Sequence, residues 1–234
     1  MLSIIISTLN EEKYLPRLLE SIKGQSYLDY EIIVSDGGSE DKTKEIAIEY
    51  NCLFIEDNKH RHPSWQRNNG ASVANGDILL FLDADTVLQP NFLENSLAEF
   101  TKRGLFGAGF YFVFNPNSFS YTIFSKIANF FCFFRQYFSP ASVGAALLAR
   151  KEAHDAISGF DVTVLLAEDY DYCDRLSHYG KFRMIKKQIL LYSSRRLQKD
   201  GWWPTAYAWI RMALFTIFNR KIRNNKIKYD FGKY

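Results

Sequence analysis

Short apolar runs alternate with amphipathic segments along the first hundred residues. The runs are rich in β-branched and large apolar side chains, as is typical of strands buried on both faces of a parallel sheet. Strands are predicted at Leu2–Thr8, Tyr30–Ser35, Cys52–Glu56 and Asp77–Leu82, and helices at Glu11–Lys23, Glu40–Tyr50 and Ser64–Ala74. Strands separated by such helices imply βαβ units with right-handed crossovers. The sequence therefore predicts an α/β fold with a mostly parallel central sheet flanked by helices.

Beyond Pro90 the pattern is less regular and more aromatic. Residues 106–138 hold 14 of the 38 aromatic residues. We interpret most of them as core and helix-packing surface, with sugar stacking or contact with a lipid tail as the alternative. Further strands are predicted at Phe110–Phe114, Ser142–Ala149, Phe182–Ile185 and Gln188–Tyr192, and helices at Asn91–Lys102, Ser118–Phe138, Leu166–Tyr179 and Trp202–Asn219. No repeat or linker interrupts the chain, which favours one domain with a C-terminal helical extension.

Composition narrows the class of protein. The 234 residues are 47% hydrophobic and 24% charged, which is ordinary for a globular protein. Three cysteines without CxxC spacing argue against a zinc site or a disulfide framework. The formal net charge is only +3, and the positive charge concentrates in residues 219–234, which contain six basic residues and one Asp. A nucleic-acid binder would more often spread basic residues over a groove-sized face, so no nucleic-acid partner is expected.

The N-terminus and the last helix bear on localisation. The first residues lack a basic region and run straight into a predicted strand, so no signal peptide is expected and the default location is cytoplasmic. Trp202–Phe218 is almost entirely apolar and precedes the basic tail, a pattern typical of interfacial membrane segments. Peripheral contact with the inner face of the membrane through residues 202–228 is one interpretation; docking on the chain's own domain or on a partner subunit is the other.

Two carboxylates, Asp83 and Asp85, follow the strand predicted to end at Leu82. Ligands of open α/β sheets bind at the carboxyl ends of the strands. Hard oxygen ligands there suit Mg²⁺ or Mn²⁺, which usually also hold substrate phosphates. The pair therefore indicates a metal-bridged phosphate ligand.

Polar residues also follow the first two predicted strands, at Ser7–Glu11 and Asp36–Asp41. Parallel strands end at one edge of the sheet, so these groups should lie beside Asp83 and Asp85. Asp36 can bind a base or ribose there. Alternatively, Asp36 belongs to a turn in which Ser39 is the N-cap of the next helix. The two roles are compatible.

A second acidic cluster, Glu168-Asp169-Tyr170-Asp171, opens a predicted helix. Acidic residues in a first helical turn are favoured by the helix dipole, which is a sufficient structural explanation. A catalytic role requires one of these carboxylates to lie near the metal.

Five motifs in this order and spacing resemble those of the family 2 glycosyltransferases, from about Leu2 to Gly201-Trp202-Trp203. They are Ser7-Thr8-Leu9-Asn10-Glu11-Glu12, Ser35-Asp36-Gly37-Gly38-Ser39-Glu40-Asp41, Arg67-Asn68-Asn69-Gly70, Asp83-Ala84-Asp85 and Glu168-Asp169. The resemblance implies a GT-A fold, a nucleotide-diphosphate sugar donor, a divalent metal (Mg²⁺ or Mn²⁺) and inversion at the anomeric carbon. Residues 1–200 would form the GT-A domain, with a nucleotide-binding half (1–105) and an acceptor-side half (106–200), and 201–234 the apolar helix and basic tail.

The resemblance also implies a role for each matching residue. Asp169 would be the general base that takes the acceptor proton, and Asp85 would ligate the metal. Asp83 would contact the ribose, and Arg67 would lie near the nucleotide, against a phosphate or Asp83. The residues that would line the base and ribose are Ser7, Thr8, Asn10, Glu11 and Asp36.

The chain departs from the commonest family pattern in three places. Ser7-Thr8-Leu9-Asn10 replaces Pro-Thr-Tyr-Asn, and Gly37 stands where many members have a second Asp. The absence of Gln-x-x-Arg-Trp argues against processive polymerisation. Instead, Arg195-Arg196 resembles a pair found in a subgroup of small bacterial members. Such a pair can clamp a donor diphosphate; the alternative is a solvated or acceptor-side basic patch.

The predicted function is therefore inverting, metal-dependent transfer of a sugar, with a UDP-sugar donor favoured by family frequency. The acceptor would be a hydroxyl of a glycan or a lipid-linked molecule. A nucleotidyltransferase is an alternative, but Leu9-Asn10-Glu11-Glu12 is not the glycine- and lysine-rich phosphate loop expected after its first strand. A non-catalytic nucleotide-sugar-binding protein is another, although retention of both Asp85 and Asp169 argues against it.

Overall fold

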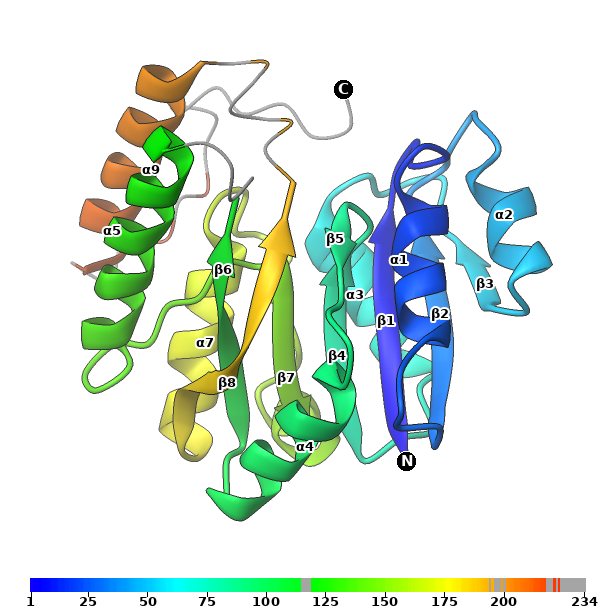
Figure 1. Ribbon diagram of the computed structural model, residues 1–234, viewed down its shortest axis with the longest axis horizontal. Coiled ribbons are helices and arrows are strands. Elements are labelled where there is room, and N and C mark those ends of the chain that lie inside the picture. Colours follow the sequence, from blue (N-terminus) through cyan, green and yellow to red (C-terminus); the bar gives the residue numbers. More distant parts are fainter. Residues whose placement is uncertain are drawn as a thin grey trace.

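A computed structural model describes residues 1–114, 119–193, 195, 199, 201–217, 221 and 223, and an eight-stranded sheet forms its centre (Figure 1). The strands are β1 (Leu2–Thr8), β2 (Tyr30–Asp36), β3 (Leu53–Glu56), β4 (Ile78–Asp83), β5 (Thr86–Val87), β6 (Gly107–Val113), β7 (Ala146–Arg150) and β8 (Phe182–Tyr192). The helices are α1 (Leu15–Lys23), α2 (Thr43–Glu49), α3 (Pro63–Ser72), α4 (Phe92–Lys102), α5 (Phe119–Arg135), α6 (Lys151–Ala156), α7 (Glu168–Tyr179) and α9 (Trp202–Ile217).

The strand order is β3-β2-β1-β4-β7-β6-β8-β5, and the first four strands are parallel, as predicted. The second half is mixed. Strand β7 runs antiparallel to both β4 and β6, β8 is parallel to β6, and β5 is antiparallel to β8. The prediction of an α/β fold with a largely parallel sheet is confirmed, and the antiparallel pairings all involve β5 or β7.

Two predicted elements in the second half differ from the structure. The segments at 182–185 and 188–192 form one strand, β8, whose pairing shifts in register opposite Phe110 and Tyr111. The Glu99 carboxylate accepts hydrogen bonds from the N–H groups of Lys186 and Lys187 at this irregularity, so the strand continues through it. The strand predicted from Ser142 begins only at Ala146.

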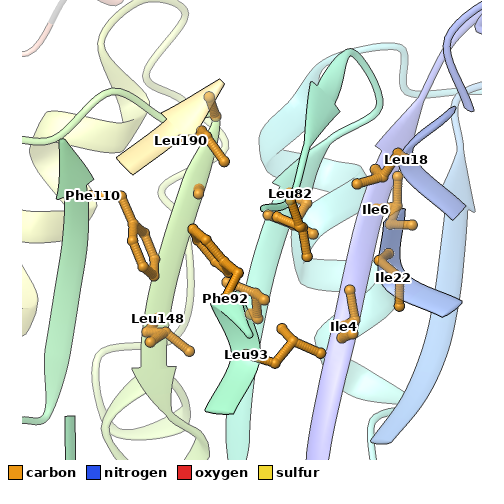
Figure 2. Close-up of a cluster of buried hydrophobic side chains, with 14 of the residues drawn as sticks. Ile4, Ile6, Leu18, Ile22, Leu82, Phe92, Leu93, Phe110, Leu148 and Leu190 are labelled. Atoms are coloured by element: carbon orange, nitrogen blue, oxygen red, sulfur yellow. The ribbon is translucent and has the colours of Figure 1, made fainter. Parts of the chain in front are cut away.

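The core lies on both faces of the sheet, because alternate residues of each buried strand point to opposite sides. Ile4 and Ile6 of β1 pack with α1 and α4 on one face, shown in Figure 2, while Ile5 packs on the other face. The second face is covered by α3, α6 and α7, with Phe81 of β4 fully buried at its centre. Apolar residues on both sides of a strand are what the uninterrupted runs in the sequence predict.

Helices α5 and α9 lie side by side at one edge of the molecule (Figure 1). Asn129 of α5 donates to the carbonyl of Phe112 in β6 and accepts from its N–H group, which fixes α5 along this strand. Trp209 of α9 contacts Phe124 of α5, with 5.2 Å between ring centroids. The C-terminal helix therefore packs on the chain's own domain.

The packing around Phe81 predicts a large contribution to stability. Its ring meets those of Phe160 and Tyr172 edge-on at 5.1 and 5.9 Å. Phe81→Ala should lower the free energy of unfolding by about 3–5 kcal/mol, because it leaves a cavity at a site with no exposure. Urea denaturation measures the loss. Leu53→Ala on β3, at 47% exposure, should cost less than about 1 kcal/mol; equal losses would contradict this description of the core.

Candidate active site

The carboxyl ends of β1, β2 and β4 meet at one edge of the sheet. Ser7 pairs with Ser35 on one side and Asp83 on the other, and Thr8 pairs with Asp36. A cavity of about 180 Å³ lies over this edge. The predicted site residues that line it are Ser7, Thr8, Glu11, Arg67, Asp83, Asp85, Asp169 and Arg195. The structure thus brings both acidic clusters, from the two halves of the sequence, to one cavity.

Asp36 and Asn10 shape the loops beside the cavity but do not line it. One oxygen of Asp36 accepts from the Thr8 and Ser39 hydroxyls, and the other accepts from the N–H groups of Gly38 and Ser39, at 2.6–2.9 Å. These four bonds fill the acceptor capacity of a carboxylate. The Asn10 side chain accepts from the Glu40 N–H. Contacts of Asp36 and Asn10 with a base stay predictions, and that of Asp36 requires one of its four bonds to be released.

The turn predicted at Asp36–Ser39 is present, and Gly38 adopts a φ of +85°, which favours glycine. Ser39, however, is not a helix N-cap, so that part of the prediction is wrong. Helix α2 begins later, at Thr43, where the Asp41 carboxylate accepts from the Thr43 N–H. Ser39 instead accepts a hydrogen bond from the Asn10 N–H and ties the first two loops together.

Arg195 forms ion pairs with two carboxylates near the carboxyl ends of β1 and β4. Its guanidinium donates two hydrogen bonds to Glu11, at 2.7 and 2.9 Å, and its Nε lies 2.9 Å from an oxygen of Asp85. Burial raises the pKa of the Asp85 carboxyl to about 7, with Arg195 opposing the rise and Asp83 and Glu11 adding to it. Burial also raises the pKa of Glu11. Arg195 thus compensates acidic groups that would otherwise be costly to bury. Arg196 lies outside the described residues.

Arg67 of α3 forms the second bridge. One of its terminal nitrogens lies 2.9 Å from Asp83, and the other lies 3.1 Å from Glu168 at the start of α7. It also donates to the Gly144 carbonyl and lies over the Phe160 ring. Burial alone would lower the pKa of Arg67, but the surrounding carboxylates raise it above its ordinary value. Of the two contacts proposed for Arg67 from the sequence, the one with Asp83 is present.

Asp169 is held by two backbone N–H groups. Gly144 donates to one of its oxygens at 2.7 Å and Tyr170 to the other at 2.9 Å. Burial and the adjacent Glu168 carboxylate raise the pKa of Asp169 to about 7, against the effect of Arg67. A carboxylate with this pKa can accept a proton near neutrality, which is the property required of a general base.

The side chains at this edge of the sheet could bind a divalent metal only if a substrate supplied some of the ligands. No cluster of three or more His, Cys, Asp or Glu side chains suited to a metal ion occurs in the part of the chain that the structure describes. Mg²⁺ usually takes one or two carboxylates and completes its shell with substrate phosphates and water. Asp85 can supply one carboxylate on those terms, provided that Arg195 leaves the oxygen that it contacts.

Gly144 and Glu168 also line the site, although the sequence-based prediction gives neither of them a role. A Cβ on Gly144 would lie 3.1 Å from both Arg67 and Asp169, so glycine permits the backbone to approach both side chains. The sequence holds one signal of this, a glycine inside an apolar run, which often marks close backbone approach. Glu168 belongs to the Glu168-Asp169 motif, but its ion pair with Arg67, 101 residues away, has no signal in the sequence.

The fold and the acidic sheet edge together define a glycosyltransferase-type GT-A protein. The Glycosyl transferase family 2 sequence family matches residues 3–157, and the chain belongs to this family. The GalNAc(5)-diNAcBac-PP-undecaprenol beta-1,3-glucosyltransferase of Campylobacter jejuni is 36% identical over 37% of this chain and 30% of its own length. An uncharacterized glycosyltransferase of Methanocaldococcus jannaschii is 26% identical over 82% of this chain and 70% of its own.

Solved structures show the same fold. The mannosyltransferase PcManGT of Pyrobaculum calidifontis, solved with GDP-Man and Mn²⁺, superposes with a TM-score of 0.76 at 16% identity, over 96% of this chain and 66% of its own. Residues 1–349 of S. aureus TarS give a TM-score of 0.68 at 17% identity, over 92% of this chain and 65% of theirs. The first two curated relatives are matched over only 30% and 34% of their length, so this chain spans about a third of them.

The raised pKa of Asp169 predicts a pH-dependent stability. Its value of about 7 lies above the ordinary value, so the folded protein binds this proton more tightly than the unfolded chain does. The contribution of Asp169 to the free energy of unfolding should therefore fall as pH rises from about 4 to 7. In Asp169→Asn the fall between pH 4.5 and 8 should be smaller by roughly 1–4 kcal/mol, measured by urea denaturation.

The matched control is Asp155→Asn on α6, an exposed side chain. Asp155→Asn should change the pH dependence of stability less than Asp169→Asn does, because this side chain is exposed. An unchanged pH dependence in Asp169→Asn would contradict the environment described for this carboxyl group.

Proposed function

We propose that this protein transfers a sugar, with inversion, from a nucleotide-diphosphate donor to an acceptor hydroxyl. The observation that carries the proposal is the shared cavity: Asp85 follows β4, Asp169 opens α7, and both side chains line it. Inverting transfer needs one group for the leaving diphosphate and another, on the acceptor side, for the attacking hydroxyl. The two carboxylates are separated along the chain and are suited to these two tasks.

We assign donor binding to residues 1–105 and acceptor binding to residues 106–200, within a catalytic domain of 1–200. Ser7, Thr8, Glu11 and Asp83 stand at the carboxyl ends of β1 and β4, where open α/β sheets bind nucleotides. The bond from Arg67 holds Asp83 at this edge, where it can accept a hydrogen bond from a ribose hydroxyl. A UDP-sugar is our preferred donor.

The charge of the cavity supports a cation as part of the donor complex. Among the described residues that line it, five are carboxylates and three are arginines, an excess that favours added positive charge beside an anionic diphosphate. Asp85 would hold Mg²⁺ or Mn²⁺, which would neutralise charge on the diphosphate as it departs. Arg195 contacts Asp85 in the structure and would move to the diphosphate, together with Arg196. The Mn²⁺ in the solved mannosyltransferase is consistent with such a site.

Asp169 is the proposed general base. The N–H groups of Gly144 and Tyr170 fix the carboxylate, and its pKa near 7 leaves an ionised fraction ready to take the acceptor proton. Arg67 and Glu168 stand next to it and keep its environment charged and ordered.

We place the acceptor on a lipid. The Campylobacter jejuni relative is named for a PP-undecaprenol-linked molecule. No helix in the described ranges is long and apolar enough to cross a membrane. Contact of residues 202–228 with the cytoplasmic face of the membrane would bring the enzyme to such an acceptor without a spanning segment.

The first test concerns Asp85. Asp85→Ala should abolish Mn²⁺-dependent binding of the donor, because the variant lacks the carboxylate proposed to hold the metal. Isothermal titration with a panel of nucleotide sugars, with and without Mn²⁺, measures this. Asp77→Ala, whose side chain is 94% exposed at the opposite end of β4, should bind like the wild type. Donor binding that is insensitive to Mn²⁺ in the wild type would refute the metal site.

The second test separates chemistry from binding. Asp169→Asn should bind donor normally but transfer sugar about 10²–10⁴-fold more slowly, because the amide cannot take the acceptor proton. Transfer is followed by nucleotide release with the same panel of donors and an acceptor extract. Transfer at the wild-type rate would show that Asp169 is not the base, and tight binding without turnover in the wild type would favour a non-catalytic binding protein.

A further inference from the structure

Helix α5 is apolar on both of its long faces. Its inner face packs on the domain, with Phe124 and Cys132 buried. Its outer face carries a stripe at helical spacing whose members are 39–82% exposed: Phe119, Ile123, Ile127, Phe130, Phe134 and, just past the helix, Phe138. A helix that is apolar all round is normally covered on every side. The outer stripe therefore indicates a surface that meets something other than water.

Helix α9 extends the same surface. Trp203, Tyr207 and Ile210 follow one another at helical spacing and are 76%, 63% and 59% exposed. Among the side chains that the structure describes, nine exposed large ones are aromatic; eight of these lie on α5, the turn after it, or α9, and the ninth is Tyr179. The two helices stand together at one edge of the molecule (Figure 1). We call this combined surface the α5–α9 face.

The opposite side of α9 is a wall of the candidate active site. Thr205, Trp209 and Met212, which also follow at helical spacing, line the cavity. The cavity stripe and the exposed stripe are offset by two residues, which is about 200° around a helix. Helix α9 thus lines the candidate active-site cavity with one side and contributes to the α5–α9 face with the other.

Charge selects the occupant of this face. Residues 119–138 and 202–217 contain no Asp or Glu. Their basic residues are Lys126, which is exposed, Arg211, which is partly exposed, and Arg135, which is buried. The segment 219–234 holds six basic residues and one acidic residue; two of the basic ones, Lys221 and Arg223, pair with Asp161, and the segment is not counted as part of this face. An apolar, aromatic-rich surface with only basic charges complements the headgroups and acyl boundary of an anionic membrane. Two copies of the same face would bring like charges together, which disfavours a homodimer.

We infer that the α5–α9 face docks on an anionic membrane surface and holds the mouth of the cavity at the lipid boundary. The inference deepens the proposed function: the acceptor would be a lipid whose polar head enters the cavity past α9 while its tail stays in the membrane. It also moves the principal contact from residues 202–228 to a surface in which α5 contributes the larger stripe.

The test is flotation of the full chain with vesicles of phosphatidylcholine containing about one third phosphatidylglycerol. Phe130→Asp/Phe134→Asp on α5 should weaken binding at least about tenfold. Leu28→Asp/Ile48→Asp adds the same charge at exposed apolar sites elsewhere, 76% and 57% exposed, and should bind like the wild type. Tyr207→Asp/Ile210→Asp on α9 is a second, independent disruption. Loss of binding in the α5 and α9 variants alone supports the inference.

Three outcomes would overturn it. They are failure of the wild type to float, flotation of both the α5 and the α9 variants at the wild-type level, and a wild-type dimer that the α5 variant converts to a monomer. Donor binding, measured by titration without vesicles, reports on the proposed function separately. Flotation without any donor binding would leave the docking face standing and refute the transferase, whereas sugar transfer by a wild type that does not float would do the reverse.

Discussion

The ion pairs of one buried arginine hold the candidate site together. Arg67 is 3% exposed and lies between Asp83 at the end of β4 and Glu168 at the start of α7. Removal of one partner from such a buried pair typically costs about 3–5 kcal/mol, because a charge is left uncompensated. These contacts fix the opening of α7 against the sheet edge. Asp169, the next residue, is thereby placed in the same cavity as Asp85.

The second constraint on the site is the close approach of the Gly144 backbone to two side chains. Its N–H group donates to Asp169 and its carbonyl accepts from Arg67. The strand predicted from Ser142 starts only at Ala146, so Gly144 has its polar groups available for side chains rather than for a neighbouring strand. The late start of β7 is therefore part of how the site is built. A longer strand would have used the same groups for sheet pairing.

The two arginine bridges differ in what they imply. Arg67 is enclosed on several sides, by two carboxylates, a carbonyl and the Phe160 ring. Arg195 contacts Glu11 and Asp85 at the edge of the cavity and lies over the Tyr14 ring. The first is suited to a permanent structural role. The second pairs with Asp85, so a cation bound there would compete with Arg195 for this carboxylate, and a diphosphate would compete with the carboxylates for Arg195. Arg67 fixes α7 against the sheet edge, and Arg195 compensates the charge of acidic groups that would be costly to bury unpaired.

The sequence by itself determined the parallel half of the sheet, because strands apolar on both faces and separated by amphipathic helices allow few other arrangements. The same regularity placed Ser7, Asp36 and Asp83 at one edge, since parallel strands end on the same side. The tertiary structure decided what local pattern cannot encode: that Asp36 also accepts from Thr8, 28 residues away, that Glu168 meets Arg67 across 101 residues, and that α5 keeps an apolar face outward. The first two depend on a partner distant in the chain, and the third on which side of α5 the rest of the domain covers. Spacing along a sequence holds no information about distance in space.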